Sequence, residues 1–391
     1  LIKVSMEVAV MTSRERVAAA IEHRAVDSVP LMLWLEPHTT LKMAVHYQKP
    51  RRLTDKLAIR WIDRMSHELP TEELRNGVPL LTYLIHGQYL RELGADIVET
   101  QWSPAVFLPR GFWLEKGKMR FKDFYGITRA IGGIYMEHVD VPCKTKEDLD
   151  HYRFPDASNP LHYLHIRAYR GMNPDVAILG WCPGVQDYSQ SWHTIEQLYI
   201  GMIEYPDTTK RFFAKMTDHT LQIIRGMMKA GADMIMIGDD YGNQRSLMMS
   251  KAMWEEFTYP CLKRQIETIH KYGGKALLHS CGTVAPLLDR FVEAGLDALH
   301  PFQPLPGNNL EEAKKEFGDH LAFCTGIDVQ KIPEMTPEEV REDIIRVYSI
   351  AGQGGGLVLA TTNALQYDTP IENIRAMFKT IKDIQSGKIK I

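Results

Sequence analysis

A histidine and a cysteine stand two positions apart at the end of an apolar run in residues 277–288, LLHSCGTVAPLL. In an extended segment, residues i and i+2 project to the same side, so His279 and Cys281 can reach one ion. Imidazole and thiolate form a zinc-type ligand pair, but a zinc site needs at least one more protein ligand. The alternative is a buried histidine bonded to the backbone beside a small buried thiol. Residues at other strand ends that could complete a metal site are Cys324, Cys182, Asp239 and Asn363.

Two adjacent carboxylates follow a second apolar run, MIMI, in the stretch GDDYGNQ (238–244). An acidic pair flanked by glycines fits a catalytic loop, in which a carboxylic acid donates or accepts a proton. Adjacent strand residues face opposite ways, so we expect only one of Asp239 and Asp240 to point into a site. The alternative is a helix N-cap with a solvated partner. We predict catalytic roles for Asp239, Asp240 and His279.

Aromatic and polar side chains near other strand ends are candidates for substrate binding. The stretch VPLMLWLEPHTT (29–40) carries a tryptophan, a glutamate and a histidine after an apolar run. Such a tryptophan can be a packing residue, but aromatic rings at a strand end can also stack on an aromatic ligand. The residues that we predict to bind substrate are Trp34, Glu36, His38, Trp181, Tyr241, Gln303 and Asn363.

The elements that must position these residues alternate between short apolar runs and helical stretches, which indicates a parallel sheet. The predicted strands lie at 29–34, 96–101, 176–181, 234–238, 275–279, 298–302, 321–326 and 356–361. The predicted helices include 251–272, 284–294, 309–317, 337–351 and 371–386. No G-x-G-x-x-G follows the first strand, which argues against an open dinucleotide-binding sheet. We therefore predict a (β/α)8 TIM-type barrel, whose chemistry lies at the C-terminal ends of its strands.

We predict one barrel domain over residues 1–391, with a tail and an N-terminal helical extension within residues 1–25. Residues 101–135 break the alternation of strands and helices. Within them GFWLEKGKMRFKDFYGITRAIGG alternates in polarity and contains the turn-like EKGK, which predicts a β-hairpin insertion.

Composition excludes several classes of protein. The net charge is −3 and basic residues form no stripe, which argues against a nucleic-acid binder. We expect no transmembrane helix, because no apolar run approaches 18 residues. The five cysteines are an odd number in a long chain, so we expect reduced thiols and a cytoplasmic protein.

Taken together, several stretches resemble the uroporphyrinogen decarboxylase superfamily. The resemblance extends over nearly the whole chain from Met11 and implies one (β/α)8-type barrel with its pocket at the strand C-termini. The matching stretches are MTSRERVAAAIEHRAVDSVPLMLW, GDDYGNQRSLMMSKAMWEEFTYPCLKR, LLHSCGTVAPLLDRFVEAGLDALHPFQP and TPIENIRAM.

The resemblance implies one of two chemistries. One branch decarboxylates uroporphyrinogen without metal and carries arginines after the first strand that grip the substrate's carboxylates. Here that place reads PLMLWLEPHT, with Leu35 and Thr39 where the arginines would be and a like charge at Glu36. A polyanionic porphyrinogen would meet no cationic clamp, which argues against this branch.

The other branch transfers methyl groups to or from a corrinoid on a separate protein, with zinc bound by H-x-C and a later cysteine. His279 and Cys281 match the pair, but Asn363 stands at the place of the later cysteine. Either another ligand such as Cys324 or Asp239 completes a zinc site, or the chain resembles the members that demethylate a small substrate. We expect a methyltransferase that takes methyl from a methoxylated aromatic and passes it to the Co(I) corrinoid of a partner protein. The alternatives are a decarboxylase of a tetrapyrrole or another acid, a methylcobamide:thiol methyltransferase, and a non-catalytic corrinoid- or tetrapyrrole-binding barrel. Membership of the superfamily also makes a homodimer plausible.

Overall fold

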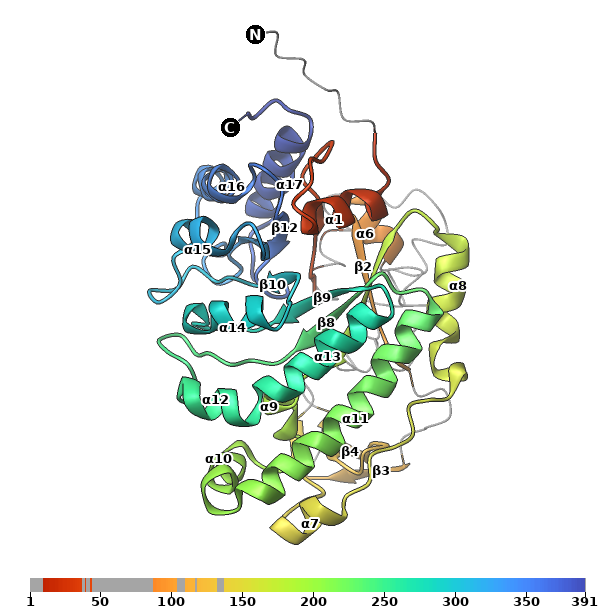
Figure 1. Cartoon of the computed structure of the whole chain (residues 1–391). Helices are drawn as coiled ribbons and strands as arrows, with labels where there is room; N and C mark the ends of the chain where they lie inside the picture. The colour runs from red at the N-terminus through yellow and green to blue at the C-terminus, as the bar shows by residue number, and fades with distance from the viewer. Residues whose placement is uncertain are drawn as a thin grey trace.

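A computed structural model describes residues 10–36, 39, 43, 87–103, 110–116, 118–131 and 137–390 of the chain. Within these residues, eight parallel strands form one sheet in the order β1-β12-β11-β10-β9-β8-β7-β2 (Figure 1). The strands are β1 (Leu31–Met32), β2 (Ile97–Gln101), β7 (Ala177–Pro183), β8 (Met234–Gly238), β9 (Lys275–His279), β10 (Ala298–His300), β11 (Ala322–Ile327) and β12 (Leu357–Thr361). Each lies within one residue of a predicted strand or inside it, apart from the C-terminal end of β7.

Helices connect successive strands and cover the outside of the sheet (Figure 1). They are α1 (Ser13–Ile21), α6 (Gln88–Glu92), α7 (Lys146–His151), α8 (Leu164–Met172), α9 (Gln186–Ser189), α10 (Ile195–Glu204), α11 (Pro206–Ala230), α12 (Lys251–Phe257), α13 (Tyr259–Lys271), α14 (Leu288–Glu293), α15 (Leu310–Phe317), α16 (Pro337–Ala351) and α17 (Ile371–Gln385). The prediction of one helix over 251–272 is wrong: Thr258 separates α12 from α13, and Pro260 occupies the first turn of α13. Among the described helices, none combines the length and apolar character needed to span a bilayer.

Alternate strand residues point into the barrel, as the period of a β-strand requires. On β9 and β10, Leu277 and Ala298 belong to the interior cluster. Their neighbours Leu278 and Leu299 pack outward with the helices. Two positions further along each strand, the same inward side is reached by His279 and His300. The histidines therefore stand above the apolar filling of the barrel, at the C-terminal strand ends.

The ring of strands closes between β1 and β2 through the backbone and the carboxylate of Asp96. The N–H of Asp96 donates to the carbonyl of Leu31 at 2.9 Å, and the Leu31 N–H donates back to the Asp96 carboxylate at 2.9 Å. Helix α1 sends Val17 and Ile21 into the interior cluster. These contacts close the sheet as a (β/α)8 barrel and confirm the predicted fold class.

We expect Arg16→Gln to lower the free energy of unfolding by about 3–5 kcal/mol, because it leaves a buried carboxylate without its cation. The Arg16 guanidinium contacts both Asp96 and Asp27 at 2.6 Å, and the Asp96 side chain is only 4% exposed. Urea denaturation measures the change. The matched control is Arg14→Gln, whose half-exposed guanidinium pairs with Asp233 and should be worth about 1 kcal/mol or less. Equal losses in the two variants would contradict this account of barrel closure.

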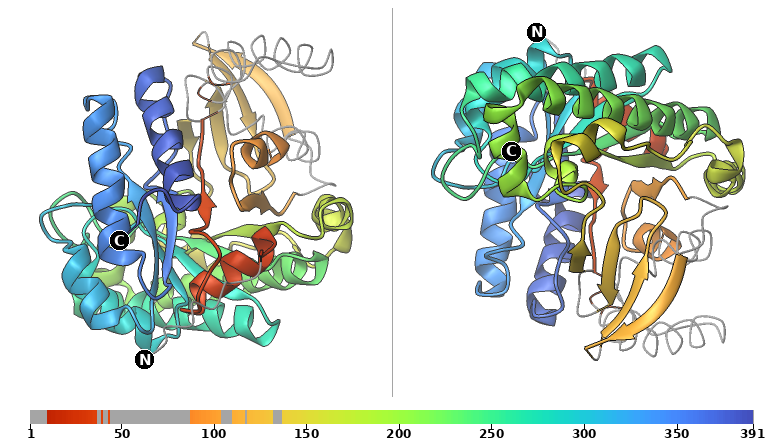
Figure 2. Two further views of the ribbon diagram at one scale, coloured as in Figure 1. Left: turned by 90° about the horizontal axis from the view of Figure 1, so that it is seen from above. Right: turned by 90° about the horizontal axis from the view of Figure 1, so that it is seen from below.

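The insertion after β2 is larger than the single hairpin predicted for 101–135. It forms a second, antiparallel sheet in the order β3-β4-β5-β6 (Figure 2). Its strands are β3 (Arg110–Glu115), β4 (Lys118–Lys122), β5 (Thr128–Ile131) and β6 (Glu137–Asp140). The predicted hairpin is β3 and β4, and the error is the omission of the two strands that extend it to Asp140. This sheet stands to one side of the barrel in both views.

Candidate metal centre

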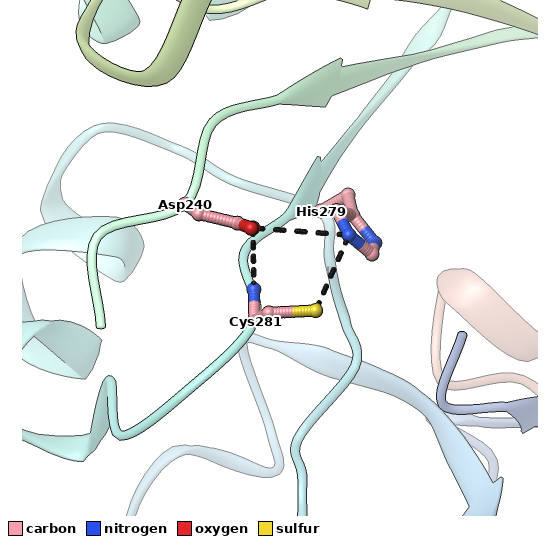
Figure 3. A group of neighbouring side chains, drawn as sticks. All are labelled: Asp240, His279 and Cys281. Atoms are coloured by element: carbon pink, nitrogen blue, oxygen red, sulfur yellow. Dashed lines mark hydrogen bonds and ion pairs between the residues drawn. The ribbon is translucent and has the colours of Figure 1, made fainter. Parts of the chain in front are cut away.

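Asp240, His279 and Cys281 bring three potential ligand atoms within 4.8 Å of one another, and we call these residues the ligand group (Figure 3). His279 Nε2 lies 3.5 Å from Cys281 Sγ and 3.8 Å from Asp240 Oδ1. The backbone N–H of Cys281 donates to the same Asp240 oxygen at 2.7 Å. One carboxylate oxygen, one imidazole nitrogen and one sulfur therefore face a common point.

Two adjoining loops hold the ligand group together. The loop after β8 carries Asp240, and the turn after β9 carries Cys281. The two loops touch at glycines: a Cβ on Gly282 would lie 2.3 Å from the carbonyl carbon of Gly242. The Thr283 N–H also donates to the Asn243 carbonyl at 2.8 Å. This close backbone approach is what puts the Asp240 carboxylate next to the Cys281 N–H.

Burial shifts the side chains of the ligand group toward their neutral forms. Burial lowers the pKa of His279 to about 3, so its imidazole is neutral at physiological pH. Burial and the neighbouring Asp240 charge raise the pKa of the Cys281 thiol to about 12. Burial likewise raises the pKa of Asp240, against the pull of the Cys281 N–H. In the described part of the chain, the hydrogen bonds and ion pairs of these three residues include no lysine or arginine. A divalent cation bound here would deprotonate the thiol and stabilise the thiolate and the carboxylate.

The donor set fits zinc. Zinc accepts sulfur, imidazole nitrogen and carboxylate oxygen at about 2.0–2.3 Å, so two ligand atoms of one tetrahedral ion lie about 3.3–3.8 Å apart. The 3.5 Å between His279 Nε2 and Cys281 Sγ matches a nitrogen–sulfur pair on one ion, and the 3.8 Å between Nε2 and Asp240 Oδ1 is a few tenths of an ångström longer than a nitrogen–oxygen pair requires. Three protein ligands are the number found in catalytic zinc sites, where the fourth position takes water or substrate.

Asn363 lies beside the ligand group. It stands at the position where the resemblance implies a cysteine in the relatives that bind zinc. Its side-chain amide donates to Cys281 Sγ at 3.5 Å, and this contact opposes the rise in the thiol's pKa. Asn363 is brought there by the pairing of the segments after β1 and β12, in which Leu35 bridges Leu365. The predicted proximity of Asn363 to the site is thus seen in the structure, with the amide as a hydrogen-bond donor to sulfur.

Two tryptophans flank the ligand group. The Trp34 ring centre lies 4.9 Å from that of His279 and 5.5 Å from that of Trp181. The Trp181 ring is 5.6 Å from His279. Both tryptophans are half-buried. The Trp34 indole N–H is itself buried and has no hydrogen-bond partner in the described part of the chain. Two of the predicted substrate-binding residues therefore lie together beside the ligand group.

Asp239 faces away from Asp240 and forms hydrogen bonds with the neighbouring loop. Its carboxylate accepts from the N–H groups of Val185, Gln186 and Asp187, at 2.6 to 3.2 Å. The sequence allowed the acidic pair to be a helix N-cap instead of a catalytic pair. Asp239 does cap backbone N–H groups, but those of residues 185–187 at the start of α9. Burial raises the pKa of Asp239 to about 7, against the effect of these backbone donors. Asp240 is therefore the carboxylate of the pair that enters the site, as the strand alternation predicts.

The remaining candidates for substrate binding lie in different places. The Gln303 side chain accepts from the Gly282 N–H at 2.6 Å, so it supports the turn that carries Cys281. It also lines a cavity of about 440 Å³ beside α15 and α16. Glu36 is buried just beyond the segment that carries Trp34. His38 lies outside the described residues.

Three candidate residues are not part of this site. Cys324 packs inside the barrel with Val358 and Met236, so the structure does not bring it to the ligand group as a third ligand. The Cys182 thiol points outward and donates to the carbonyl of Thr220 on α11. Tyr241 is buried behind the loop, 5.2 Å from the ring of Trp254, and cannot stack on a ligand at the strand ends.

Sequence reasoning missed His300, which lies beneath the ligand group. Its Nδ1 is 2.8 Å from His279 Nδ1, and the residue is fully buried. The predicted strand over 298–302 points instead to Gln303, the residue that follows it. The signal was present in the sequence, because Ala298 and His300 share the inward parity that Leu277 and His279 share on the preceding strand.

Comparison with known proteins finds a matching family model, related sequences and a chain of similar fold. A model of the family described as uroporphyrinogen decarboxylase (URO-D) matches residues 132–384. A uroporphyrinogen decarboxylase from Anaeromyxobacter dehalogenans is 26% identical over 259 residues, which cover 61% of this chain and 69% of that protein. One from Coxiella burnetii is 21% identical over 254 residues, covering 62% and 68%. Among solved structures, a methyltransferase from Methanosarcina mazei shares the fold with a TM-score of 0.65 and 18% identity, over 95% of this chain and 99% of that one.

Proposed function

The chain belongs to the uroporphyrinogen decarboxylase family of enzymes, and on that premise we propose that it is a metal-assisted methyltransferase. The methyl donor would be a small methylated compound, best a methoxylated aromatic, and the acceptor the Co(I) corrinoid of a partner protein. The observation that carries the proposal is the ligand group itself. A neutral imidazole, a thiol and a carboxylate converge at the C-terminal strand ends, where barrel enzymes hold their active sites.

Asp240, His279 and Cys281 would hold the metal in this proposal. A bound zinc ion would act as a Lewis acid toward the ether oxygen and make the phenolate a better leaving group. Cys281 supplies a soft sulfur ligand, and the Asn363 amide donates to that sulfur in place of a further thiolate. Its carboxylate and thiolate would carry the same total charge as two cysteine thiolates, but only one of its ligands would be sulfur. A site with a single soft sulfur ligand suits the binding of a hard ether oxygen better than the binding of a thiol, which argues against the methylcobamide:thiol alternative.

Asp240 offers a second way to assist the leaving group. Its burial raises the pKa of its carboxyl group, so the carboxyl can hold a proton at a higher pH than a solvated aspartate. In metal-free chemistry that proton would pass to the ether oxygen as the carbon–oxygen bond breaks. The bonding electrons of that bond remain with oxygen, and the methyl group bonds to cobalt through the electron pair of Co(I). Asp239 cannot take this role, because its carboxylate is engaged by the backbone of residues 185–187.

Trp34 and Trp181 support an aromatic substrate. Their rings stand 5.5 Å apart beside His279, which provides apolar walls for a flat ring near the ligand group. The buried indole N–H of Trp34 can donate to a substrate oxygen, which would satisfy a polar group that otherwise has no partner. Positioning the ether between these walls and the ligand group would align its methyl group for in-line transfer.

Decarboxylation of uroporphyrinogen is the second candidate, and the named curated relatives favour it. The site residues favour it less. A substrate with many carboxylates calls for cationic partners, whereas the ligand group and its described contacts consist of neutral and acidic side chains.

A direct assay separates the two functions. We expect methoxyarenes to methylate cob(I)alamin in the presence of the enzyme, read as the absorbance of methylcobalamin. Uroporphyrinogen should emerge unchanged on chromatography. Cys281→Ala should reduce methyl transfer by about 10²-fold or more, since it removes a metal ligand. Cys261→Ala, which changes a buried thiol on α13, serves as the matched control and should retain activity. Loss of carboxylate from uroporphyrinogen, with no methylation from any methoxyarene, would overturn the proposal.

A further inference from the structure

His300 makes two hydrogen bonds that together fix its own protonation pattern. Its Nε2 lies 2.9 Å from the backbone carbonyl oxygen of Thr361, and its Nδ1 lies 2.8 Å from Nδ1 of His279. A carbonyl oxygen can only accept, so the proton of His300 is on Nε2. His300 is fully buried and makes no hydrogen bond or ion pair with a carboxylate among the described residues, so a second proton would leave an unpaired buried charge. Its Nδ1 is therefore a hydrogen-bond acceptor.

The same reasoning fixes the tautomer of His279. Because His300 Nδ1 accepts, the proton between the two rings belongs to Nδ1 of His279. A neutral His279 then carries its lone pair on Nε2. That nitrogen is the one that faces Cys281 Sγ at 3.5 Å and Asp240 Oδ1 at 3.8 Å.

We propose that His300 is a positioning residue. Its hydrogen bonds to the Thr361 carbonyl and to His279 keep the proton of His279 on Nδ1, so that the Nε2 lone pair of His279 is directed at the ligand group. The inference deepens the proposed function, because it rests on a metal bound at that group. Trp34 helps to hold the arrangement, since its ring packs 4.6 Å from His300 and 4.9 Å from His279. The backbone adds a further tie, with the Ser280 N–H donating to the His300 carbonyl at 2.8 Å.

The first test needs no variant. Two-dimensional ¹⁵N NMR of the metal-free, full-length protein distinguishes the two neutral imidazole tautomers. We expect His279 to carry its proton on Nδ1 and His300 to carry its proton on Nε2. A proton on Nε2 of His279 would overturn the inference. Because no metal or substrate is present, this result stands whether or not the proposed methyl transfer is correct.

The second test measures zinc affinity by competition with a chromophoric chelator. We expect His300→Leu to weaken zinc binding about 10–100-fold, the usual effect of removing the hydrogen-bond partner of a ligating histidine. His300→Asn retains an acceptor oxygen and should restore affinity to within about 3-fold of wild type. The control is His219→Leu, which removes a buried histidine on α11 that bonds to Tyr125 and packs against Trp102 and Phe154, and it should leave zinc affinity unchanged.

The outcomes separate this inference from the function on which it rests. Wild-type affinity in His300→Leu, or equal losses in His300→Leu and His219→Leu, would overturn the positioning role. A wild-type protein that binds no zinc would refute the metal part of the proposed function, and the tautomer measurement would still decide the role of His300.

Discussion

Cys281→Ala is expected to lower the zinc content of the purified protein from about one ion per chain to near zero. Removing the thiol deletes the one sulfur of the ligand group and leaves a neutral imidazole and a single carboxylate. Neither an isolated histidine nor an aspartate holds zinc strongly at micromolar concentrations, so the loss should be nearly complete. Elemental analysis of protein purified without added zinc measures the content directly.

The control for this prediction is Cys324→Ala, which tests the ligand that the sequence suggested. Cys324 is fully buried in the barrel interior, so its replacement removes a thiol without touching the ligand group. We expect Cys324→Ala to keep its zinc. Loss of zinc from Cys324→Ala but not from Cys281→Ala would mean that the metal binds elsewhere. An absence of zinc from the wild type would leave metal-free chemistry, with Asp240 as the acid.

Gly282→Ala is expected to weaken zinc binding about 10–100-fold and to destabilise the fold. Gly282 has φ +88°, a conformation that costs other residues about 1–3 kcal/mol. The added Cβ would also lie 2.3 Å from a backbone atom of Gly242, which has no flexible side chain that could move aside. The loops of Asp240 and Cys281 must therefore separate, and their ligand atoms with them. Chelator competition measures the affinity, and urea denaturation measures the stability.

Gly273→Ala isolates the part of this effect that comes from backbone strain alone. Gly273 follows α13, has φ +76°, and would place its Cβ at least 4 Å from any other heavy atom beyond its immediate neighbours. This variant should lose stability through its unfavourable φ and keep its zinc affinity. If Gly282→Ala binds zinc as tightly as Gly273→Ala does, the contact between the two loops does not control the geometry of the ligand group.

The barrel could be predicted from the sequence because most of its strands are short apolar runs followed by helical stretches. Residues 234–238 and 275–279 match β8 and β9 residue for residue. The antiparallel sheet was underestimated, since β5 and β6 are four-residue strands with few apolar positions. Their pairing depends on contacts between segments, which local polarity does not encode.

Part of the site could be predicted from strand parity, the alternation of inward- and outward-facing residues along a strand. Parity alone places His279 and Cys281 together and separates Asp240 from Asp239. It does not give the stagger between neighbouring strands, which a closed barrel requires. Cys324 has inward parity, but it pairs with Val358 within the apolar interior. Tyr241 follows a turn in which parity no longer applies.

The hydrogen bonds between neighbouring loops have a consequence for how this barrel can change length during evolution. Asp239 ties the loop after β8 to residues 185–187, Asp240 ties it to Cys281, and Gln303 ties the turn after β9 to the loop after β10. An insertion or deletion in one of these loops would displace the side chain on which the next loop depends. The antiparallel sheet is inserted after β2. The end of β2 makes none of the hydrogen bonds just named. Added segments are therefore expected at the ends of strands outside the run from β7 to β10, where they can alter which substrates enter while the ligand group stays intact.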